Sequence, residues 1–467
     1  MMKLKGKKAL VIGLGKTGQS SARFLAKQGA RVIVTDSKPK SEFTDAIKGL
    51  ADVKIDFEFG KHSPKYFTSV DFIVLSPGVP SDIDGLVEAR AKKIPIINDI
   101  ELAYPFIKAP IVAVTGTNGK TTTAALIAEM LRNDGKKVFL GGNIGTPVLN
   151  YLQSSEQADV VVLEVSSFQC ESLDTFKPKI AVFTNLEPDH LDRYPAGVES
   201  YYTAKSRLLC NAGKDTVLVT NLENERAARL TQGFPGKIYS FTKQSPMSRS
   251  PALAERFQGA YLQKPKMVVK IKSEKNGGDK NGTDEEFNLM TCRLAGDHNR
   301  ENLMAAACAA KAVGCSKESI QKTIENFRGV PHRLEYIRRK DGVYFYNDSK
   351  ATNVASVIRA LSAFTAPIIL IAGGRDKDQD FSPLVDLVRQ RVKHLILLGE
   401  AKEKINRIIG DFSETFLVGT FEEAVLLAYQ KSRSGDVILL SPGCASYDMF
   451  KNYEERGDYF KKLVGQL

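Results

Sequence analysis

Tryptophan is absent from this sequence of 467 residues, histidine occurs only five times, and the six cysteines are far apart, with no C-x-x-C pair. This spacing indicates neither a zinc site nor a disulfide framework, because both use cysteines that recur at short, regular intervals. Scattered, unpaired thiols are typical of a reducing compartment. We therefore expect a cytoplasmic protein.

Long apolar runs are missing as well. No stretch approaches the roughly 18 consecutive apolar residues of a membrane-spanning helix. The basic start MMKLKGKK is followed by the apolar run ALVI, which is too short for the core of a signal peptide. We expect no interaction with a membrane.

A surface of one charge sign is not evident, although the formal net charge is +12. The 66 Lys and Arg residues are mixed along the chain with 54 Asp and Glu residues, and no basic stripe is interleaved with stacking aromatics. This charge favours solubility and the attraction of anionic small molecules such as nucleotides. We expect no nucleic-acid partner.

What the sequence does contain is a globular composition, with 43% apolar and 26% charged residues. Domains typically hold roughly 100 to 200 residues, so this length predicts two to four of them. Short apolar runs alternate with amphipathic segments in three series, which is the pattern of parallel sheets covered by helices. The expected strands are ALVIG, RVIVTD, DFIVLS and IPIIN, then IVAVTG, KVFLGG, DVVVLEVSS, KIAVFTN and TVLVTN, and finally VYFYN, PIILIAGG, HLILLG and DVILLSPG.

Helices are expected near 17–28, 83–92 and 300–313, and the polar segment 271–287 is expected to be a solvated loop or hairpin tip. The segment FRGVPHR (327–333) interrupts the pattern with Gly329 and Pro331, and we predict a hinge there. We therefore predict an α/β protein of three tandem domains, at residues 1–98, 99–329 and 330–467. The outer two would be Rossmann-like.

The first glycine-rich turn is Gly13-x-Gly15-x-x-Gly18, between an expected strand and a helix, with Asp36 at the end of the next strand. This is the context of a dinucleotide-binding turn, where a helix N-terminus offers N–H groups to a pyrophosphate. The same geometry serves any nucleotide diphosphate, so NAD is one of several possible ligands. Asp36 would bind a ribose hydroxyl or simply end a strand, and SPG (76–78) would approach the same ligand or be an ordinary turn.

A second loop, TGTNGKT (115–121), resembles a phosphate-binding loop with altered spacing. The general pattern G-x-x-x-x-G-K-[ST] requires glycine at position 114, where this chain has Val114. The chemical groups are nevertheless present: Gly116 and Gly119 allow N–H groups to converge on phosphate, Lys120 adds a positive charge, and Thr121 adds a hydroxyl for Mg²⁺. We predict a central domain of the P-loop ATPase type.

Acidic residues follow two expected strands of the central series. Glu164 ends DVVVLEVSS, and Asp189, His190 and Asp192 follow KIAVFTN. The carboxyl ends of parallel strands meet at one edge of a sheet, so these side chains are candidate Mg²⁺ ligands beside the phosphate loop. By composition alone, Lys205 is an ordinary solvated lysine of a helix.

The segments TGTNGKTTT, GGNIGTP, EVSSFQ, NLEPDHLDRY, HNRENLMAA, GVPHRLE, NDSKATN and SPGCASYDMF occur in the order seen in the Mur ligases, and the resemblance spans nearly the whole chain. Mur ligases are ATP-dependent amide ligases of peptidoglycan precursor synthesis. Within the family, the combination is most similar to members that add D-glutamate to UDP-N-acetylmuramoyl-L-alanine. The first glycine-rich turn then looks like the site of a UDP-sugar, which disfavours a nicotinamide cofactor.

The resemblance implies a reaction in which ATP phosphorylates the free carboxylate and the amino group of D-glutamate attacks the acyl phosphate, leaving ADP and phosphate. A carboxylate resists amines because oxide is a poor leaving group, and phosphorylation removes that obstacle. Two bound substrates also gain from proximity. We expect a monomer that requires ATP and Mg²⁺.

The resemblance also implies roles for single residues. The catalytic residues would be Lys120, His190, Lys205 and Arg333. ATP would contact Gly116, Thr117, Asn118, Gly119, Lys120, Thr121, Thr122, Asn299, Asn302, Arg333 and Asp348. Two Mg²⁺ ions would bind, the first at Thr121 and Glu164 and the second at His190 and a carbamylated Lys205. The UDP-linked substrate would contact Gly15, Thr17, Asp36, Gly78, Asn143 and His190, and D-glutamate would contact Lys350, Thr352, Lys377, Ser446 and Tyr447.

Plainer roles remain open for several of these residues. Asn299 and Asn302 lie where a helix cap would be, Arg333 would form an interdomain ion pair, Lys350 would be a surface lysine, and Lys205 would be unmodified. The chain also departs from the family at Arg375-Asp376, just before Lys377, where other members often differ.

Other functions are also open. The L-alanine-adding enzyme and folylpolyglutamate synthase share the chemistry, although the latter gives no reason for the N-terminal GLGKTG unit. A nucleotide-switched binding protein is a third alternative, and a guanine-reading N-K-x-D motif is not evident. The D-[DN]-P-R motif of the diamino-acid-adding relatives is absent.

Overall fold

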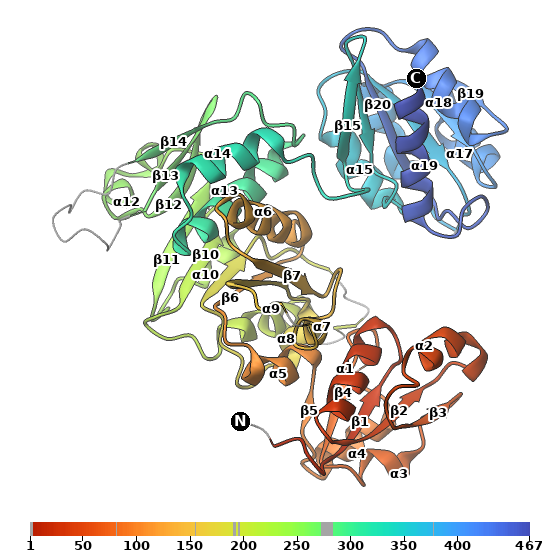
Figure 1. Ribbon diagram of the computed structural model, residues 1–467. Helices are drawn as coiled ribbons and strands as arrows, with labels where there is room; N and C mark the ends of the chain where they lie inside the picture. The colour runs from red at the N-terminus through yellow and green to blue at the C-terminus, as the bar shows by residue number, and fades with distance from the viewer. Residues whose placement is uncertain are drawn as a thin grey trace. The chain divides into compact units, whose positions relative to one another are not determined.

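The computed structural model describes residues 3–80, 82–154, 156–189, 193–194, 197–271, 284–376 and 378–467. Within these ranges the strands form three separate sheets (Figure 1). The contacts divide the chain into two compact units, Met1–Met290 with Glu301–Thr323 and Thr291–Arg300 with Ile324–Leu467. The first unit holds two of the sheets and the second unit holds the third.

The first sheet is parallel, with the strand order β3-β2-β1-β4-β5. Successive residues of its central strand enter different clusters, Ala9 and Val11 on one face and Leu10 and Ile12 on the other. Apolar residues on both faces of a strand are expected where helices cover both faces of a sheet. The strands are β1 (Lys8–Ile12), β2 (Arg31–Asp36), β3 (Ile55–Phe59), β4 (Phe72–Leu75) and β5 (Ile96–Ile97), and the helices are α1 (Lys16–Lys27), α2 (Thr44–Gly49), α3 (Pro64–Phe67) and α4 (Asp84–Ala91).

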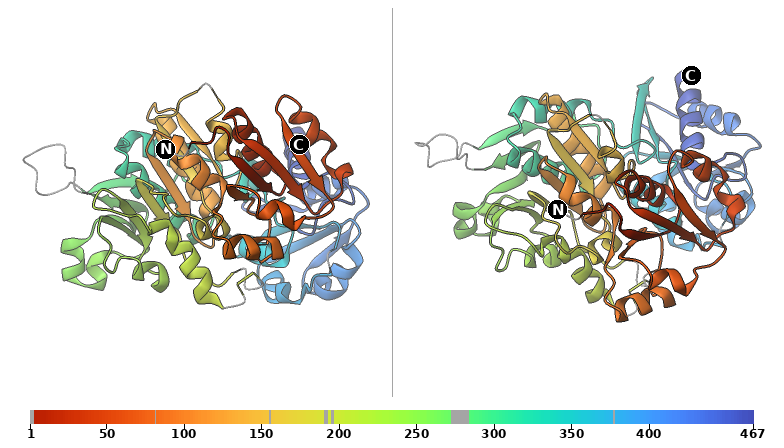
Figure 2. Two further views of the ribbon diagram at one scale, coloured as in Figure 1. Left: turned by 90° about the horizontal axis from the view of Figure 1, so that it is seen from below. Right: turned by 60° about the horizontal axis from the view of Figure 1, so that its bottom comes forward.

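The second sheet has the order β14-β13-β12-β11-β10-β9-β6-β8-β7 and ends in an antiparallel edge at β12, β13 and β14. Its strands are β6 (Ile111–Thr115), β7 (Val138–Gly142), β8 (Val160–Glu164), β9 (Ile180–Phe183), β10 (Val217–Asn221), β11 (Lys237–Thr242), β12 (Gly259–Gln263), β13 (Lys266–Lys270) and β14 (Glu285–Asn288). The helices are α5 (Asp99–Ala103), α6 (Lys120–Asn133), α7 (Val148–Tyr151), α8 (Ser167–Glu171), α9 (Val198–Ser206), α10 (Glu225–Arg229), α11 (Pro246–Arg249), α12 (Pro251–Arg256), α13 (Asp297–Ala312) and α14 (Lys317–Asn326). Figure 2 shows the helices along these sheets from two further directions.

The third sheet has the order β15-β16-β20-β17-β18-β19, parallel except for the β15–β16 hairpin. Its central strand alternates in the same way as β1, with Leu370 in one core cluster and Ile369 and Ile371 in the other. The strands are β15 (Glu335–Lys340), β16 (Val343–Asn347), β17 (Ile368–Gly373), β18 (Val392–Leu398), β19 (Glu414–Leu417) and β20 (Val437–Gly443), and the helices are α15 (Val354–Ser362), α16 (Val385–Arg391), α17 (Lys402–Ile409), α18 (Phe421–Lys431) and α19 (Tyr453–Gln466).

The predicted α/β architecture is confirmed, and each of the apolar runs named above forms a strand. The sequence reading missed seven strands of the described residues. Four of them, β3, β14, β15 and β19, lie at sheet edges and contain segments such as EYIRRK, and the other three, β11, β12 and β13, lie within the second sheet. Edge strands carry charged residues that protect an exposed sheet edge, and these residues weaken the apolar pattern. Of the polar segment 271–287, residues 272–283 lie outside the described residues.

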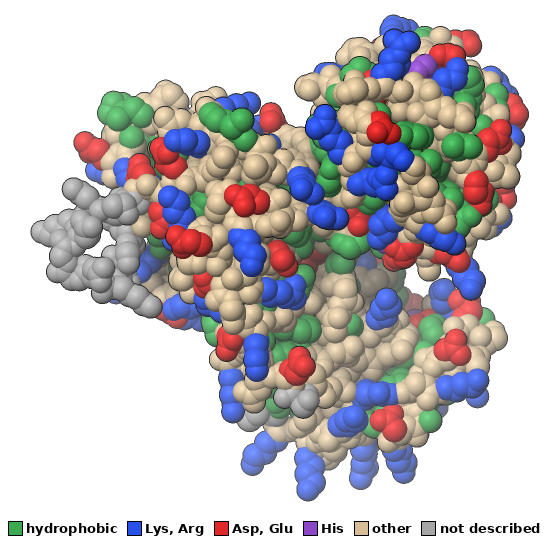
Figure 3. All heavy atoms as spheres, turned by 45° about the horizontal axis from the view of Figure 1, so that its top comes forward, with side chains coloured by type: hydrophobic (Ala, Val, Ile, Leu, Met, Phe, Trp, Pro, Cys, Tyr) green, Lys and Arg blue, Asp and Glu red, His purple; other side chains and the backbone are tan. Residues whose placement is uncertain are grey.

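The surface in Figure 3 has basic and acidic side chains interspersed over most of the face shown. In the part of the chain that the structure describes, every helix is too short or too polar to span a bilayer.

Leu439 tests the packing of the third sheet. This residue of β20 is fully buried, and truncation of a buried leucine to alanine costs about 2–5 kcal/mol. We expect Leu439→Ala to lower a calorimetric unfolding transition by several degrees. Leu417→Ala, on the edge strand β19 and 42% exposed, is the control and should change the transition little. Equal shifts in the two variants would contradict this account of the core.

Candidate functional site

The loop between β6 and α6 is closely packed at its two glycines. Gly116 has φ +141° and Gly119, which caps α6, has φ +81°. A Cβ atom at Gly116 would lie 2.0 Å from Thr184 Oγ1, and one at Gly119 would lie 2.1 Å from Asn302 Oδ1. Both positions therefore require glycine for two reasons, the backbone conformation and the lack of space.

Hydrogen bonds fix the loop to the segment after β9. The amide of Asn118 donates to Asn185 Oδ1 at 2.8 Å, and the amide of Thr117 donates to the Asn185 carbonyl at 2.9 Å. The Thr117 hydroxyl lies 3.0 Å from the Tyr201 hydroxyl. The loop is held in shape by the protein itself, and it leads directly into the positive end of the 14-residue helix α6, a favourable place for phosphate.

Polar side chains gather around Glu164 at the end of β8. Glu164 is 2% exposed, and its carboxylate accepts from Thr121 Oγ1 at 2.8 Å and from Asn143 Nδ2 at 3.0 Å. Lys120 folds back over the loop, where its Nζ donates to the carbonyls of Gly116 and Thr117 at 3.0 and 2.8 Å. The phosphate loop, a carboxylate and a hydroxyl thus meet at one edge of the sheet.

Lys205 is buried, contrary to the solvated lysine that composition alone indicated. It is 1% exposed, and its Nζ donates to the Gly116 carbonyl at 2.8 Å and lies 4.9 Å from the centre of the Tyr201 ring. Burial, with a smaller effect of the positive charge on Lys120, lowers the pKa of Lys205 to about 7. A substantial fraction of this amine is therefore neutral near neutral pH.

The first glycine-rich turn lies in the same unit. Asp36 accepts from the Leu14 amide at 2.8 Å and from the Lys38 amide at 3.0 Å, so its carboxylate stabilises the turn. A Cβ at Gly18 would lie 1.8 Å from the Gly13 carbonyl oxygen, which explains the small residue there. Gly15 caps α1, which begins with Lys16 and Thr17.

The SPG turn adjoins this glycine-rich turn, because Ser76 Oγ donates to the Gly13 carbonyl at 3.3 Å. Gly78 is exposed at its tip. Arg193 donates to the carbonyls of Pro77 and Val79 at 3.3 and 2.7 Å. A pocket of about 390 Å³ lies nearby, lined by α1, the end of α2 and the segment 145–150.

In the second unit, Asp348 and Arg333 lie around the turn before β15. Asp348 is 8% exposed and accepts from the Leu334 amide at 3.1 Å and from Ser441 Oγ at 2.9 Å. Burial raises the pKa of Asp348 to about 7. Arg333 is exposed, and Asn299, also in this unit, donates through Nδ2 to the Ala295 carbonyl at 2.7 Å.

The loops 349–352 and 444–447 are joined by Arg456 of α19, which is 1% exposed. Its guanidinium donates to the Ser349 carbonyl at 2.7 Å and to the Cys444 carbonyl at 3.2 Å. Ser446 is buried and Tyr447 is 60% exposed. The loops that carry Lys350, Thr352, Ser446 and Tyr447 are thus tied together, whereas His190 and Lys377 lie outside the described residues.

Three family models match the chain in succession. Residues 7–98 match the Mur ligase MurD-like N-terminal domain, residues 114–310 the Mur ligase middle domain, and residues 332–444 the Mur ligase glutamate ligase domain. The chain is 48% identical to a UDP-N-acetylmuramoylalanine–D-glutamate ligase of Bdellovibrio bacteriovorus, over 99% of this chain and 98% of that protein. The chain belongs to the Mur ligase family.

A second Mur ligase similar to this one, the UDP-N-acetylmuramoylalanine–D-glutamate ligase of Geotalea uraniireducens, is 44% identical over 100% of this chain and 99% of that protein. Among solved structures, the UDP-N-acetylmuramate-alanine ligase MurC of Thermotoga maritima covers 98% of this chain with 99% of its own, at a TM-score of 0.56 and 20% identity. At that identity the structural likeness concerns the fold alone.

As a Mur ligase, the protein is an ATP-dependent amide ligase that uses ATP and Mg²⁺. Mg²⁺ is held by oxygen ligands, usually one or two carboxylates together with phosphate oxygens and waters. The Thr121 hydroxyl and the Glu164 carboxylate, already 2.8 Å apart, fit that donor set. Among the described residues, no group of three or more His, Cys, Asp and Glu side chains could hold a metal ion by itself.

Sequence reasoning missed several residues that the structure places around the candidate sites. Tyr201 lies four residues before the predicted Lys205 on α9, so helical spacing was the available signal. Asn185 and Arg193 lay within the quoted segments FTN and LDRY but had no feature that separated them from ordinary polar residues. Arg456 had no local signal in the sequence. One of its partners, Ser349, is 107 residues away, and the other, Cys444, lies in the loop before α19.

Gly119 is the sharpest test of the loop. Gly135 has nearly the same φ, +80° against +81°, but a Cβ at Gly135 would meet nothing within 4 Å. We expect Gly135→Ala to lose roughly 1–2 kcal/mol of stability from backbone strain and to keep its affinity for MgATP. Gly119→Ala should weaken MgATP binding by at least about tenfold in isothermal titration calorimetry, because the added carbon displaces the loop or Asn302. Equal affinities would contradict the close fit.

Proposed function

We propose that this Mur ligase joins D-glutamate to UDP-N-acetylmuramoyl-L-alanine through an acyl phosphate, with release of ADP and phosphate, in the cytoplasmic synthesis of peptidoglycan precursors. The observation that carries this proposal is the similarity to two relatives named for that activity, at 48% and 44% identity over nearly the full chain. The matches to the MurD-like N-terminal model and to the glutamate ligase model support it.

The phosphate loop, Gly116 to Thr122, binds the β- and γ-phosphates of ATP, and Lys120 provides positive charge next to the transferred phosphoryl group. Lys120 already spans the loop by its bonds to Gly116 and Thr117, so its ammonium needs only to exchange carbonyls for phosphate oxygens. Asn302 and Asn299 of α13 also contact ATP in this proposal. Asn302 packs against the Gly119 position of the loop.

Thr121 and Glu164 hold the first Mg²⁺, and His190 with a carbamylated Lys205 holds the second. The metal ions neutralise phosphate charge and make phosphorus more electrophilic. Carbamylation needs a neutral amine, and the buried, low-pKa Lys205 supplies one. The modification turns a cation into an anionic oxygen ligand, which suits its place beside Glu164 and the loop.

We assign contacts with ATP also to Arg333 and Asp348, which lie in the second unit. The Arg333 guanidinium stabilises the negative charge that develops on the transferred phosphoryl group. Asp348 accepts from the Leu334 amide next to Arg333, so it also orients the turn that carries this arginine.

D-glutamate binds at Lys350, Thr352, Lys377, Ser446 and Tyr447. Glutamate brings two carboxylates, and lysine ammonium groups with hydroxyl and backbone N–H donors bind them by charge-assisted hydrogen bonds. The tie that Arg456 makes between the loops 349–352 and 444–447 supports a common site for their residues.

The UDP-linked substrate binds at Gly15, Thr17, Asp36, Gly78, Asn143 and His190. The N-terminus of α1 faces the pyrophosphate, in the manner of nucleotide-binding turns. Asn143 bonds to Glu164, so one end of this substrate site adjoins the metal ligands. That arrangement suits a carboxylate that must meet the γ-phosphate.

The organisation of the enzyme is part of the same proposal. We place the domain boundaries at 98/99 and 329/330, and we propose that the enzyme is a monomer. We also propose that it lies in the cytoplasm, because the free thiols of all six cysteines favour a reducing compartment. L-alanine addition and folylpolyglutamate synthesis are the alternatives within the chemistry, and neither is the activity named for the two relatives.

Substrate dependence tests the proposal directly. We expect phosphate release from ATP only when UDP-N-acetylmuramoyl-L-alanine and D-glutamate are both present, because the acyl phosphate needs one and its consumption needs the other. A coupled phosphate assay, with L-alanine and L-glutamate in place of D-glutamate as controls, measures this. Release at an equal rate without either acceptor would contradict a ligase.

Lys205 tests the carbamate. We expect Lys205→Ala to lose activity by at least about 100-fold and to regain part of it with a short carboxylate such as acetate, which replaces the carbamate oxygens. Lys214→Ala, at an exposed position, is the matched control and should need no rescue. Peptide mass analysis at high bicarbonate should find 44 Da added, roughly the mass of CO₂, at Lys205. Full activity of Lys205→Ala without rescue would contradict the carbamate.

A further inference from the structure

The turn before β15 has an unfavourable backbone. His332 has φ +62° and Leu334 has φ +41°, and neither is glycine. For an L-residue this left-handed conformation costs roughly 1–2 kcal/mol. Arg333 lies between them, so the position of its backbone depends on whatever holds this turn.

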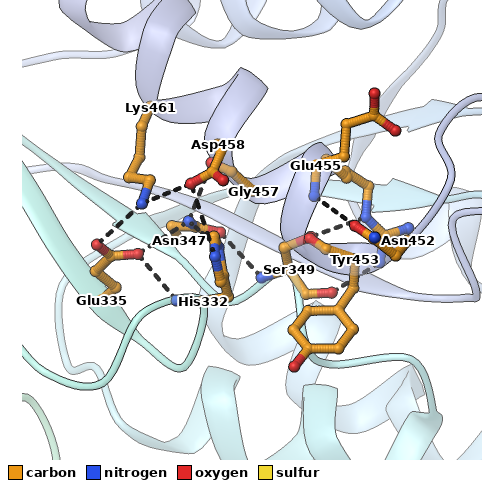
Figure 4. A network of polar contacts seen from close by, with 11 residues as sticks. His332, Glu335, Asn347, Ser349, Asn452, Tyr453, Glu455, Gly457, Asp458 and Lys461 are labelled. Carbon is orange, nitrogen blue, oxygen red and sulfur yellow. Dashed lines mark hydrogen bonds and ion pairs between the residues drawn. The ribbon is translucent and has the colours of Figure 1, made fainter. Parts of the chain in front are cut away.

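The carboxylate of Glu335 bonds directly to the turn (Figure 4). Its Oε2 accepts from the His332 amide at 2.9 Å and from Asn347 Nδ2 at 3.1 Å, while its Oε1 lies 3.5 Å from Lys461 Nζ. Glu335 and Asn347 are opposite residues of the antiparallel β15–β16 pair, so the sheet register brings them together.

Asn347 extends the contact to α19. This side chain is fully buried; its Oδ1 accepts from the Ser349 amide at 3.1 Å, and its Nδ2 lies 3.1 Å from His332 Nδ1 and 3.2 Å from the Gly457 carbonyl. Burial, with a smaller effect of Lys461, lowers the pKa of His332. A Cβ at Gly457 would lie 2.1 Å from that nitrogen, which shows how closely α19 approaches.

The same turn is bonded to the segment that follows β16. The Lys350 amide donates to the His332 carbonyl at 3.0 Å, and the Leu334 amide donates to Asp348 Oδ1 at 3.1 Å. The residue before Arg333 therefore contacts the backbone of Lys350, and the residue after it contacts Asp348. These hydrogen bonds connect the turn that carries Arg333 to the segment that carries Lys350.

We propose that Glu335 is a positioning residue of the ligase: by accepting from the His332 amide and the Asn347 side chain, it holds the strained 332–334 turn and so fixes Arg333 relative to Lys350. This inference rests on the proposed function, which gives Arg333 to ATP and Lys350 to D-glutamate. Glu335 itself touches neither substrate in this account.

The test compares Glu335→Ala with Glu335→Gln. Glutamine keeps an oxygen that accepts from the His332 amide and from Asn347, and it loses only the charge facing Lys461. We expect Glu335→Ala to raise KM for both ATP and D-glutamate about tenfold, with KM for the UDP-linked substrate changed less than about twofold. Glu335→Gln should stay within about twofold for all three.

Two further variants separate positioning from stability. Glu414→Ala removes another carboxylate of this unit, one that lies 3.0 Å from His394 and 3.4 Å from Lys431, and it should leave all kinetic constants unchanged. Gly457→Ala pushes a carbon against His332 from the opposite side, so it should reproduce the joint rise in KM for ATP and D-glutamate. If Glu335→Ala merely unfolded a fraction of the enzyme, kcat would fall and the KM values would not move.

Hydrogen exchange gives a readout that needs no substrate. The amides of Arg333, Leu334 and Lys350 are bonded within or to the turn, and we expect them to exchange at least about tenfold faster in Glu335→Ala than in the wild type. Unchanged exchange, or a Glu335→Gln variant as impaired as Glu335→Ala, would overturn the positioning role. A different result would separate the two proposals. If the wild type showed no D-glutamate-dependent activity but Glu335→Ala still exchanged these amides faster, the role of Glu335 in holding the turn would stand and the proposed function would be refuted.

Discussion

The candidate ATP site depends on the parallel pairing of β6 with β8 on one side and β9 on the other. The register places Val114 opposite Glu164 and Thr115 opposite Phe183. The residues that follow therefore emerge together at one edge: the phosphate loop, the metal-ligand candidate Glu164, and the Thr184–Asn185 segment that holds the loop. A register shift of one residue would turn Glu164 to the other face of the sheet.

That crowding explains the unusual spacing of the loop. Gly116 packs against Thr184, and Gly119 packs against Asn302 of α13. Because Thr184 and Asn302 fill the space on each side, glycine is required at these two positions, while the strand residue Val114, where the general pattern has glycine, is part of the buried sheet. The loop is thus shaped by its neighbours as much as by its own sequence, and the same crowding buries Lys205 against the Gly116 carbonyl.

In the second unit, strand register and buried polar groups likewise hold the loops in place. A hairpin register brings Glu335 to Asn347, and the buried Arg456 donates to carbonyls of two loops. A buried guanidinium needs its donors satisfied, so these carbonyls are held in fixed positions. In the second unit, buried polar groups thus fix loops that carry exposed candidate residues such as Arg333 and Tyr447.

The sequence by itself determined the α/β architecture, because buried parallel strands need continuous apolar runs and glycine-rich turns have few alternatives. The order of its motifs was enough to identify the family. The sequence could not reveal the edge strands, because their charged residues interrupt the apolar pattern of a strand. Nor could it reveal the burial of Lys205, the partners of Arg456 or the hydrogen bonds of Glu335. Those features were decided only by the tertiary structure, since the environment of a side chain is made by residues that lie far from it in the chain, 89 positions away in the case of Lys205 and Gly116.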